Sequence, residues 1–256
     1  MAAQIKKAPL RGAFLLSILL LTVTVHAESC SPCDGQLLEV AYVHDGDTLR
    51  LKDGRRLRLV GVNTPELGHG ADAEPGALAA KQQLQALVRS SEGMVRVCLD
   101  AELQDRYGRT LSHIYDRQGK SINRQLLKLG AGYHIAISPN LRNLRCYQDA
   151  EREARKGDSG VWRRPIEDAA ELHGKETGFQ VLTARVVRVG RSRSSLWLNL
   201  EGGLALRITW DDWERFHIED PDLLLHADIE VRGWIYHRDG QQRMRVRHPA
   251  SIRWLD

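Results

Sequence analysis

Hydrophobic and polar residues alternate in several short segments between residues 37 and 115. This period of two is typical of strands with one buried face. The alternating apolar positions are Leu38, Val40 and Tyr42, then Leu49 and Leu51, then Leu57 and Leu59. Residues 94–99 and 110–115 predict two further strands. Asp53-Gly54, between the second and third segments, suits a tight hairpin because glycine tolerates a positive φ.

Apolar residues at helical spacing separate or follow these strands. They predict helices over about residues 75–89, 122–129 and 141–156. Pro75 fits the opening turn of the first, and Gly130 and Gly157 close the other two. Five short strands with interspersed helices are typical of a small closed barrel, such as the five-stranded oligonucleotide-binding (OB) barrel. The fold class predicted for residues 37–162 is therefore mainly β with helices (α+β).

The strand pattern returns after a polar segment, residues 163–177, which contains Pro165 and predicts a linker. Between residues 178 and 256, apolar residues alternate at 196–200, 204–208, 229–235 and 244–248. Asp239-Gly240 predicts a hairpin, and Gly233 predicts a bulge. We expect a second small β-barrel here, for which an OB-like topology is one option.

The N-terminal region differs from the rest of the chain. Residues 13–25 are mostly apolar and follow Lys6, Lys7 and Arg11, which with Ala27 predicts a secretory signal peptide over residues 1–27. The alternative is an uncleaved anchor helix, but the apolar core is shorter than the roughly 20 residues that span a bilayer. We expect a periplasmic or secreted protein with no stable membrane span after cleavage.

Composition and charge narrow the choice of function. With 42% hydrophobic and 27% charged residues, the 256-residue chain can build packed cores, so global disorder is excluded. The formal net charge is +4, but residues 1–27 contain three basic and no acidic residues, so the remainder carries only +1. A phosphate site in the exported protein must therefore depend on individually placed arginines, because overall attraction for an anion is weak.

The four cysteines all lie after the predicted cleavage site. Cys30-Ser31-Pro32-Cys33 is a C-x-x-C motif in the N-terminal segment of the mature chain, residues 28–36. Redox and metal roles lack the expected context, whereas an exported protein favours disulfides. Four cysteines allow three pairings. Cys98 lies on a predicted strand and Cys146 on the third predicted helix, and either could pair with Cys30 or Cys33. We favour Cys146 with one of them, because the segment before the first strand can reach that helix.

Three charged segments interrupt the strand patterns. They are His44-Asp45-Gly46-Asp47-Thr48, the stretch from Arg58 to Glu66, and Asp105-Arg106-Tyr107-Gly108-Arg109. Taken singly, each fits an ordinary turn, a solvated strand end or a charged hairpin tip. Taken together, they supply carboxylates for a hard cation, a carboxylate for acid–base work and two arginines for a phosphate, which is what phosphoryl chemistry needs.

In order and spacing, these segments resemble the staphylococcal nuclease-like (thermonuclease) domain family. Residues 123–130 and Gly160-Val161-Trp162 are also similar to that family's second helix and C-terminal end. The resemblance covers about residues 39–162. It implies an OB-type barrel and a metal-dependent endonuclease that hydrolyses phosphodiester bonds of DNA or RNA with low sequence specificity, leaving a 3′-phosphate.

The resemblance also implies roles for seven residues. Ligands of Ca²⁺, or of another divalent cation, would be Asp45, Asp47, Asn63 and Thr64. Catalytic residues would be Arg58, Glu66 and Arg109. In this assignment Glu66 acts as general base or orients the attacking water, and the two arginines hold the phosphate and stabilise its developing charge.

The chain departs from the family pattern at two places. Asn63 stands where a second metal carboxylate is usual, which predicts weaker Ca²⁺ binding or a different metal preference because a negative charge is lost. The nucleotide-stacking tyrosines are expected just before Ser138-Pro139, where this chain has Ile135-Ala136-Ile137. Tyr133 could replace one of them or could belong to the core.

Arginines are frequent in residues 178–256, and Trp197 and Trp234 lie among them. One interpretation is a groove for single-stranded nucleic acid, because cationic tracks with aromatic platforms bind such strands. The other is that outward-facing arginines keep a small barrel soluble. For the whole chain, the alternative to an active nuclease is a catalytically weak or inactive nucleic-acid-binding protein of the cell envelope, which Asn63 favours.

Overall fold

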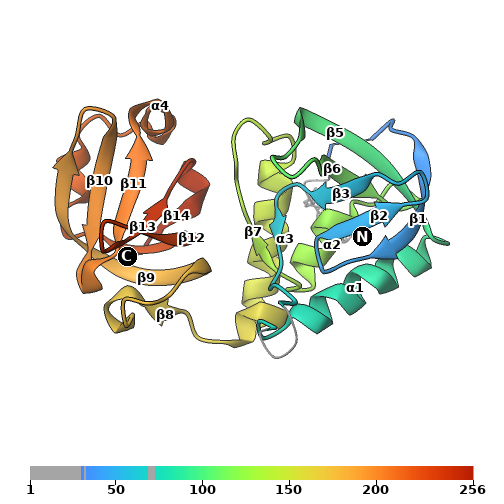
Figure 1. Ribbon diagram of the computed structural model, residues 1–256, viewed down its shortest axis with the longest axis horizontal. Coiled ribbons are helices and arrows are strands. Elements are labelled where there is room, and N and C mark those ends of the chain that lie inside the picture. Colours follow the sequence, from blue (N-terminus) through green and yellow to red (C-terminus); the bar gives the residue numbers. More distant parts are fainter. Residues whose placement is uncertain (1–29, 32, 69–72, 256) are drawn as a thin grey trace, which may run out of the picture.

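Five strands of the N-terminal half close into a barrel. The computed structural model describes residues 30, 31, 33–68 and 73–255, so the predicted signal peptide, residues 1–27, lies outside the described residues. The barrel strands are β1 (Leu37–Val43), β2 (Thr48–Leu51), β3 (Arg56–Leu59), β5 (Met94–Gln104) and β6 (Thr110–Tyr115). Their order in the ring is β1-β2-β3-β6-β5, and only the β3–β6 pair is parallel (Figure 1). The predicted five-stranded barrel is confirmed.

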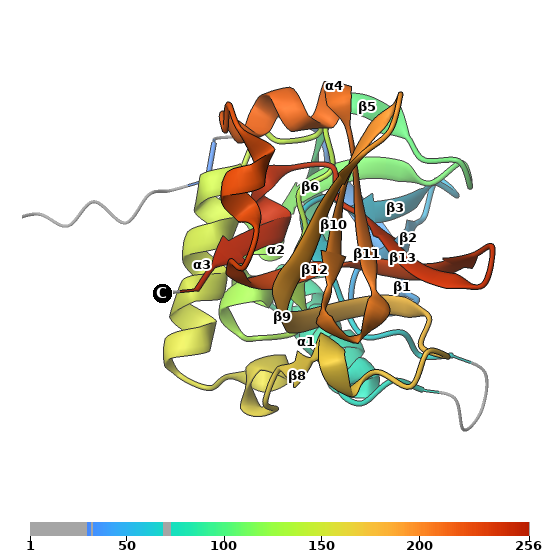
Figure 2. The same cartoon turned by 90° about the vertical axis from the view of Figure 1, so that its left-hand side faces the viewer.

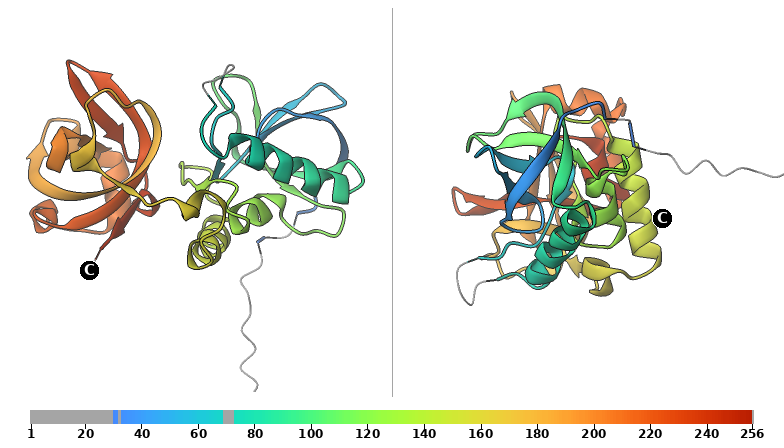
Figure 3. Two further views of the ribbon diagram at one scale, coloured as in Figure 1. Left: turned by 90° about the horizontal axis from the view of Figure 1, so that it is seen from below. Right: turned by 90° about the vertical axis from the view of Figure 1, so that its right-hand side faces the viewer.

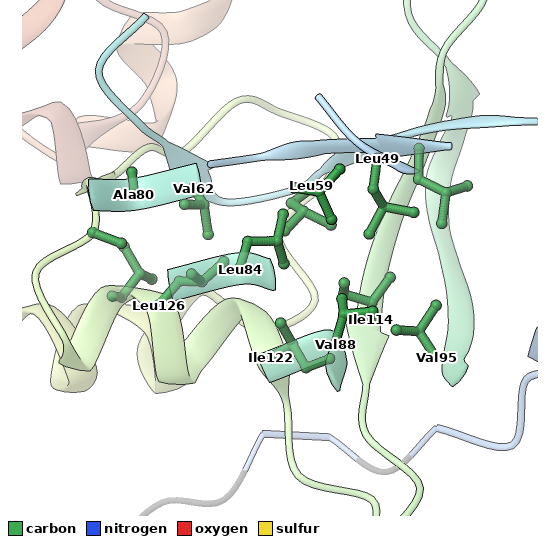
Figure 4. Packing of buried hydrophobic residues seen from close by; sticks show 14 of the residues in the cluster. Leu49, Leu59, Val62, Ala80, Leu84, Val88, Val95, Ile114, Ile122 and Leu126 are labelled. Carbon is green, nitrogen blue, oxygen red and sulfur yellow. The ribbon is translucent and has the colours of Figure 1, made fainter. Parts of the chain in front are cut away.

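Three helices pack against this barrel, namely α1 (Ala77–Ser90), α2 (Ile122–Lys128) and α3 (Leu144–Lys156). Leu84 and Val88 of α1 and Leu126 of α2 lie with barrel residues such as Leu49 and Ile114 in one apolar cluster (Figure 4). The labelled side chains in that view converge on the space between helices and barrel. The short strand β4 (Val62–Asn63) pairs with β7 (Tyr133–His134) in a separate two-stranded sheet.

The chain passes from the first barrel to a second one through the segment that contains β8 (Glu167–Asp168), as Figure 3 shows from below. Its strands are β9 (Gly178–Arg191), β10 (Ser195–Leu200), β11 (Ala205–Thr209), β12 (Asp228–Arg238) and β13 (Gln241–Arg245), with β14 (Ile252–Trp254) at the edge and the short helix α4 (Trp210–Trp213). Because β12 also pairs with β9, the ring β9-β10-β11-β13-β12 closes. As in the first barrel, one pair of neighbouring strands in the ring is parallel, here β11 and β13. The second barrel therefore repeats the topology of the first, that of an OB fold.

The prediction of a bulge at Gly233 is wrong. Gly233 pairs with Gln180 in an unbroken register between β12 and β9. A Cβ atom at this position would lie 2.8 Å from Cγ of the buried Met244. The glycine is therefore required by close packing inside the barrel, which the sequence pattern alone did not reveal.

Two disulfides fasten the segment that precedes β1. Cys30 is bonded to Cys146 of α3, and Cys33 to Cys98 of β5. The backbone N–H of Ser31 also donates to Oδ1 of Asn143 at 2.9 Å. The prediction that Cys146 pairs with one member of the N-terminal motif is confirmed. Among the described residues, no helix has the length and apolar character to cross a bilayer.

Buried ion pairs join the two barrels. The barrels lie next to each other, and in Figure 2 the second barrel is nearer to the viewer. Arg232 of β12 is 7% exposed, and its Nη1 lies 2.7 Å from both carboxylate oxygens of Glu151 in α3. The same Nη1 donates to the backbone carbonyl of His134 in β7 at 3.0 Å. Glu230, also buried, accepts from Arg155 of α3 and from Arg232. Separating the barrels would break the Arg232–Glu151 and Arg155–Glu230 pairs, so the joint favours a fixed arrangement of the two barrels.

Aromatic rings extend the joint. Tyr133 contacts Trp162 on one side and Phe179 on the other, with ring centroids 5.1 and 5.4 Å apart. Phe179 of β9 in turn meets Trp234 of β12 edge to face at 5.0 Å. These rings thus form a row from the first barrel to the second, in which Tyr133 packs between Trp162 and Phe179.

Candidate active site

A buried carboxylate forms the centre of the site. Asp47, in the turn between β1 and β2, is 4% exposed. Its Oδ2 accepts a hydrogen bond from the backbone N–H of Thr64 at 3.0 Å and lies 3.1 Å from Nη2 of Arg58. Its Oδ1 accepts from the hydroxyl of Thr48 at 3.1 Å. Pairing and hydrogen bonds of this kind offset the free-energy cost of burying a charged side chain.

Gly46 allows this turn to approach its neighbours closely. A Cβ atom there would lie 2.6 Å from Cβ of Ala80 in α1 and 2.7 Å from Cγ2 of Thr64. Real Cβ atoms do not come so near to other carbon atoms, because packed interiors have no overlapping volume. The glycine between the two aspartates therefore brings Asp47 within reach of Thr64.

Two further carboxylates experience the negative charge of Asp47. Burial, followed by the charge of Asp47, raises the pKa of Asp45, whose Oδ1 accepts from the backbone N–H of Asp47 at 2.9 Å. Partial desolvation, followed by the charges of Asp47 and Asp45, raises the pKa of Glu66. Crowded carboxylates favour a bound cation, since a positive charge would relieve their repulsion.

The two terminal nitrogens of Arg58, in β3, have different hydrogen-bond partners. Nη1 donates to the backbone carbonyls of Leu59 and Val62 at 2.8 and 2.6 Å. Nη2 faces the side-chain oxygens of Asn63 and Asp47, both at 3.1 Å. Nη1 is therefore held by backbone carbonyls, whereas Nη2 contacts two of the predicted metal ligands.

Arg109 reaches the same site from the turn between β5 and β6. Its Nε donates to Oδ2 of Asp105 at 2.7 Å, and the carboxylate of Asp105 also accepts the backbone N–H of Arg109. Nη1 of Arg109 lies 3.4 Å from the hydroxyl of Thr48, which itself donates to Asp47. Asp105 thus orients Arg109, and Thr48 connects it to the central carboxylate.

The available donors fit a hard cation in their chemistry. Asp45, Asp47, Asn63 and the backbone of Thr64 offer only oxygen atoms, which Ca²⁺ prefers. No group of three or more His, Cys, Asp or Glu side chains that could hold a metal occurs in the described part of the chain. A cation here would therefore depend on two carboxylates together with amide and backbone oxygens.

A cleft of about 760 Å³ opens between the two barrels. Arg58 and Arg109 line it from the first barrel, with Ile135, Ala136 and Ile137 beside them. The opposite wall belongs to the second barrel and includes Phe179, Trp234, Tyr236, Arg245 and Arg247. Its volume is that of sites that hold small organic ligands, roughly 300–1,000 Å³.

The residues that match known proteins lie mainly in the first barrel. The model of the family described as staphylococcal nuclease homologue matches residues 56–164. A thermonuclease from Staphylococcus intermedius is 31% identical over 141 residues, which is 54% of this chain and 82% of the relative. The chain belongs to the staphylococcal nuclease family. It is accordingly an endonuclease-type hydrolase.

Other relatives of this staphylococcal nuclease homologue differ in their names. The succinoglycan biosynthesis protein ExoI of Rhizobium meliloti (strain 1021) is 30% identical over 185 residues, 72% of this chain and 84% of that protein. An uncharacterized endonuclease of Escherichia coli O157:H7 is 26% identical over 142 residues, 52% of this chain and 79% of the relative. A match over 72% of the chain is longer than the part preceding β9, so similarity to the first of these extends into the second barrel.

The structure brings the predicted site residues together, but only some of them line the cleft. Arg58, Asn63 and Thr64 lie within hydrogen-bond distance of one another or of Asp47. Only Arg58 and Arg109 line the cleft, and the oxygen-bearing residues lie outside its lining. Of the seven predicted site residues, the two arginines thus face the cleft, whereas Asp47, Asn63 and Thr64 are buried beside Arg58.

Sequence reasoning missed two parts of the site. Thr48, which links Arg109 to Asp47, was read only as part of a turn. The wall supplied by the second barrel was also not predicted, although the frequency of arginine with Trp197 and Trp234 was the signal that could have found it. Before Ser138 the chain contributes Ile135, Ala136 and Ile137 to the cleft, and the aromatic rings that line it come from Tyr107 of the first barrel and from Phe179, Trp234 and Tyr236 of the second.

Proposed function

We propose that this nuclease hydrolyses phosphodiester bonds of DNA or RNA with little sequence preference, in a reaction that requires Ca²⁺ or another divalent cation. The observation that carries the proposal is the convergence of Asp47, Arg58, Asn63 and Thr64, with Arg109 joined to them through Thr48. Carboxylates beside two oriented arginines are suited to a phosphate diester, whose transition state gains negative charge.

The oxygen atoms of Asp45, Asp47, Asn63 and Thr64 would hold the cation. When bound, the cation supplies polarisation of a phosphoryl oxygen and charge neutralisation. Asp47 is prepared for this role because the N–H of Thr64 and the hydroxyl of Thr48 already fix both of its oxygens.

Arg58 would contribute through Nη2. The backbone carbonyls of Leu59 and Val62 keep Nη1 in place, so the orientation of the guanidinium plane is set before substrate arrives. Once Asp47 and Asn63 serve the cation, Nη2 is free to donate to a phosphate oxygen. Arg109, oriented by Asp105, would donate to the same phosphate from the turn between β5 and β6.

Glu66 would accept the proton of the attacking water. Its carboxylate is exposed, yet its pKa is raised, which makes it a better base than an ordinary glutamate. The same negative neighbours that raise its pKa would attract the cation that brings the water near.

The test uses the mature chain with single- and double-stranded DNA and RNA, in Ca²⁺ or in EDTA. We expect cleavage in Ca²⁺, and a loss of roughly 10²–10⁴-fold for Glu66→Gln and Arg58→Ala. Glu219→Gln, an exposed glutamate of the second barrel, is the control and should cleave normally. Absence of cation-dependent cleavage by the unsubstituted protein would favour the alternative, a nucleic-acid-binding protein without activity.

The two disulfides support an oxidising location, so we propose that the protein acts in the periplasm or outside the cell. Cell fractionation followed by N-terminal sequencing tests this proposal. A mature N-terminus near residue 28 in an exported fraction is expected, and a full-length cytoplasmic product would contradict it.

A further inference from the structure

The outer face of β12 and β13 alternates aromatic and cationic side chains. On β12, Trp234 and Tyr236 occupy alternate positions, so both point to the same side of the strand. On β13, Arg243 lies opposite Tyr236, and Arg245 follows two residues later. Trp234, Tyr236 and Arg245 all line the cleft that contains Arg58 and Arg109.

The same face continues beyond the cleft. A second hollow of about 340 Å³ is lined by Trp197 of β10, Arg207 of β11 and Arg243 of β13. Tyr236 lines both hollows, so they adjoin at this residue. Because Trp197 pairs with Arg207 and Arg207 with Arg245, neighbouring strands place these side chains in one row across the sheet. Strands two and three of an OB fold, and the loop between strands four and five, are the surface that binds oligonucleotides in such folds.

Positive charge is concentrated in the cleft between the barrels and is incompletely paired. Six arginines but only Glu102 and Asp105 as acidic residues line the cleft, and these arginines are Arg58, Arg106, Arg109, Arg232, Arg245 and Arg247. Arg247 makes no hydrogen bond or ion pair with a described residue, and burial and then the charge of Arg245 lower its pKa. The Nε of Arg243 is buried without a hydrogen-bond partner among the residues described. A polyanion would relieve both conditions.

We propose that this face of the second barrel is the binding track for a single-stranded nucleic acid, which runs from Trp197 past Tyr236 and Trp234 to Arg58 and Arg109. The proposal rests on the nuclease function above and specifies its substrate as unpaired strands. Aromatic side chains stack on bases that have a free face, which paired bases inside a duplex lack. The barrels face each other across the cleft, and their joint of buried ion pairs fixes the distance between the walls.

Binding is measured without cleavage, in EDTA, by fluorescence anisotropy of labelled oligothymidylate of about ten nucleotides. Trp234→Ala should weaken binding roughly 5- to 150-fold, the range for removing one stacking ring. Trp254→Ala is the matched control, because Trp254 of β14 is also 43% exposed but lies outside the cleft lining. Equal effects of the two substitutions would overturn the proposal.

Two arginine variants test the track independently of folding effects at Trp234. Arg247→Ala should reduce the slope of log affinity against log salt by about 0.7, the value for one phosphate contact on a single strand. Arg145→Ala, an exposed arginine of α3 away from both hollows, should leave the slope unchanged. Arg243→Ala should weaken binding of the longer strand but not of one of about four nucleotides, which is too short to reach both hollows.

The outcomes separate this inference from the nuclease function. If the protein cleaves with a divalent cation but binds duplex as tightly as single strand, or ignores all three substitutions, the track is wrong and the function stands. If strands bind along the track but no cation supports cleavage, the nuclease function is wrong and the track stands.

Discussion

At the scale of single residues, the site depends on atoms with more than one partner. Arg58 shows this most clearly, because one nitrogen is anchored to backbone while the other contacts two predicted metal ligands. The sequence predicted that Arg58, Asn63 and Asp47 serve one site. It could not predict that the arginine rests on the ligands, because that contact depends on how β3, β4 and the turn at Asp47 meet in space.

Asn63 offers a direct prediction at this scale. Replacing it by aspartate, Asn63→Asp, adds a negative charge beside Asp47, and affinity of oxygen sites for Ca²⁺ rises with the number of charged ligands. We expect the Ca²⁺ concentration for half-maximal cleavage to fall by about tenfold. A calcium titration of activity measures it. An unchanged half-saturation would show that residue 63 does not contact the cation.

His134 predicts a dependence of stability on pH. Burial, with help from the charge of Arg232, lowers its pKa to about 3. Because the folded pKa lies below the unfolded value, the neutral side chain contributes stability that is complete above pH 6.5 and is lost as pH falls toward 3. The loss for this one group is of the order of 5 kcal/mol when the pH has fallen below 3. Urea unfolding of the native protein and of His134→Gln between pH 7 and pH 4 should show a difference that shrinks with acid, and a constant difference would contradict the assignment.

At the scale of elements, strands and helices largely follow their sequence patterns. The predicted strand at residues 110–115 and the helices near 75–89 and 122–129 correspond to β6, α1 and α2 within a few residues. Glycines were harder to interpret, because a glycine can serve a turn or a close contact. Gly54 has a positive φ and free space around it, as a hairpin requires, whereas Gly46 and Gly233 are needed for packing against distant segments.

Gly46→Ala is therefore expected to affect activity strongly. The added methyl group would push Thr64 or α1 away and weaken the hydrogen bonds that hold Asp47. We expect cleavage to fall about 100-fold or more, with destabilisation of about 1–3 kcal/mol from overpacking. Gly54→Ala is the control, with backbone strain of about 1–2 kcal/mol from its positive φ but normal cleavage. Kinetics and thermal unfolding of both variants decide, and equal activity of the two would contradict this role of Gly46.

At the scale of the whole molecule, the topology of each barrel was within reach of the sequence, but their meeting was not. Arg232 appeared only as one of many arginines, because nothing in its neighbourhood along the chain indicates that Glu151, 81 residues away, is its partner. Similarly, alternation predicted strands in residues 178–256 but could not show that the second barrel forms one wall of the cleft. Long-range pairs of this kind depend on the three-dimensional packing of both domains.

The joint gives a prediction for the whole molecule. Arg232→Ala would remove the short ion pair of the buried Glu151 and leave it the longer contact with Nε of Arg155 at 3.9 Å, which should cost about 3–5 kcal/mol. Arg185→Ala removes an arginine from an exposed pair with Asp228 in the same barrel and should cost less than about 1 kcal/mol. Chemical unfolding of both variants compares them. If Arg232→Ala were as mild as Arg185→Ala, the barrels would not depend on this joint.

The buried joint has a consequence for how the molecule selects what it cuts. Since Arg232 is tied to Glu151 and to the carbonyl of His134, the two walls of the cleft cannot yield to a thicker guest without breaking buried ion pairs. If the cleft holds the substrate as proposed, it would select a polymer by its thickness before any bond is attacked. Selectivity of this kind needs no reading of bases, so it is compatible with a nuclease that is indifferent to sequence.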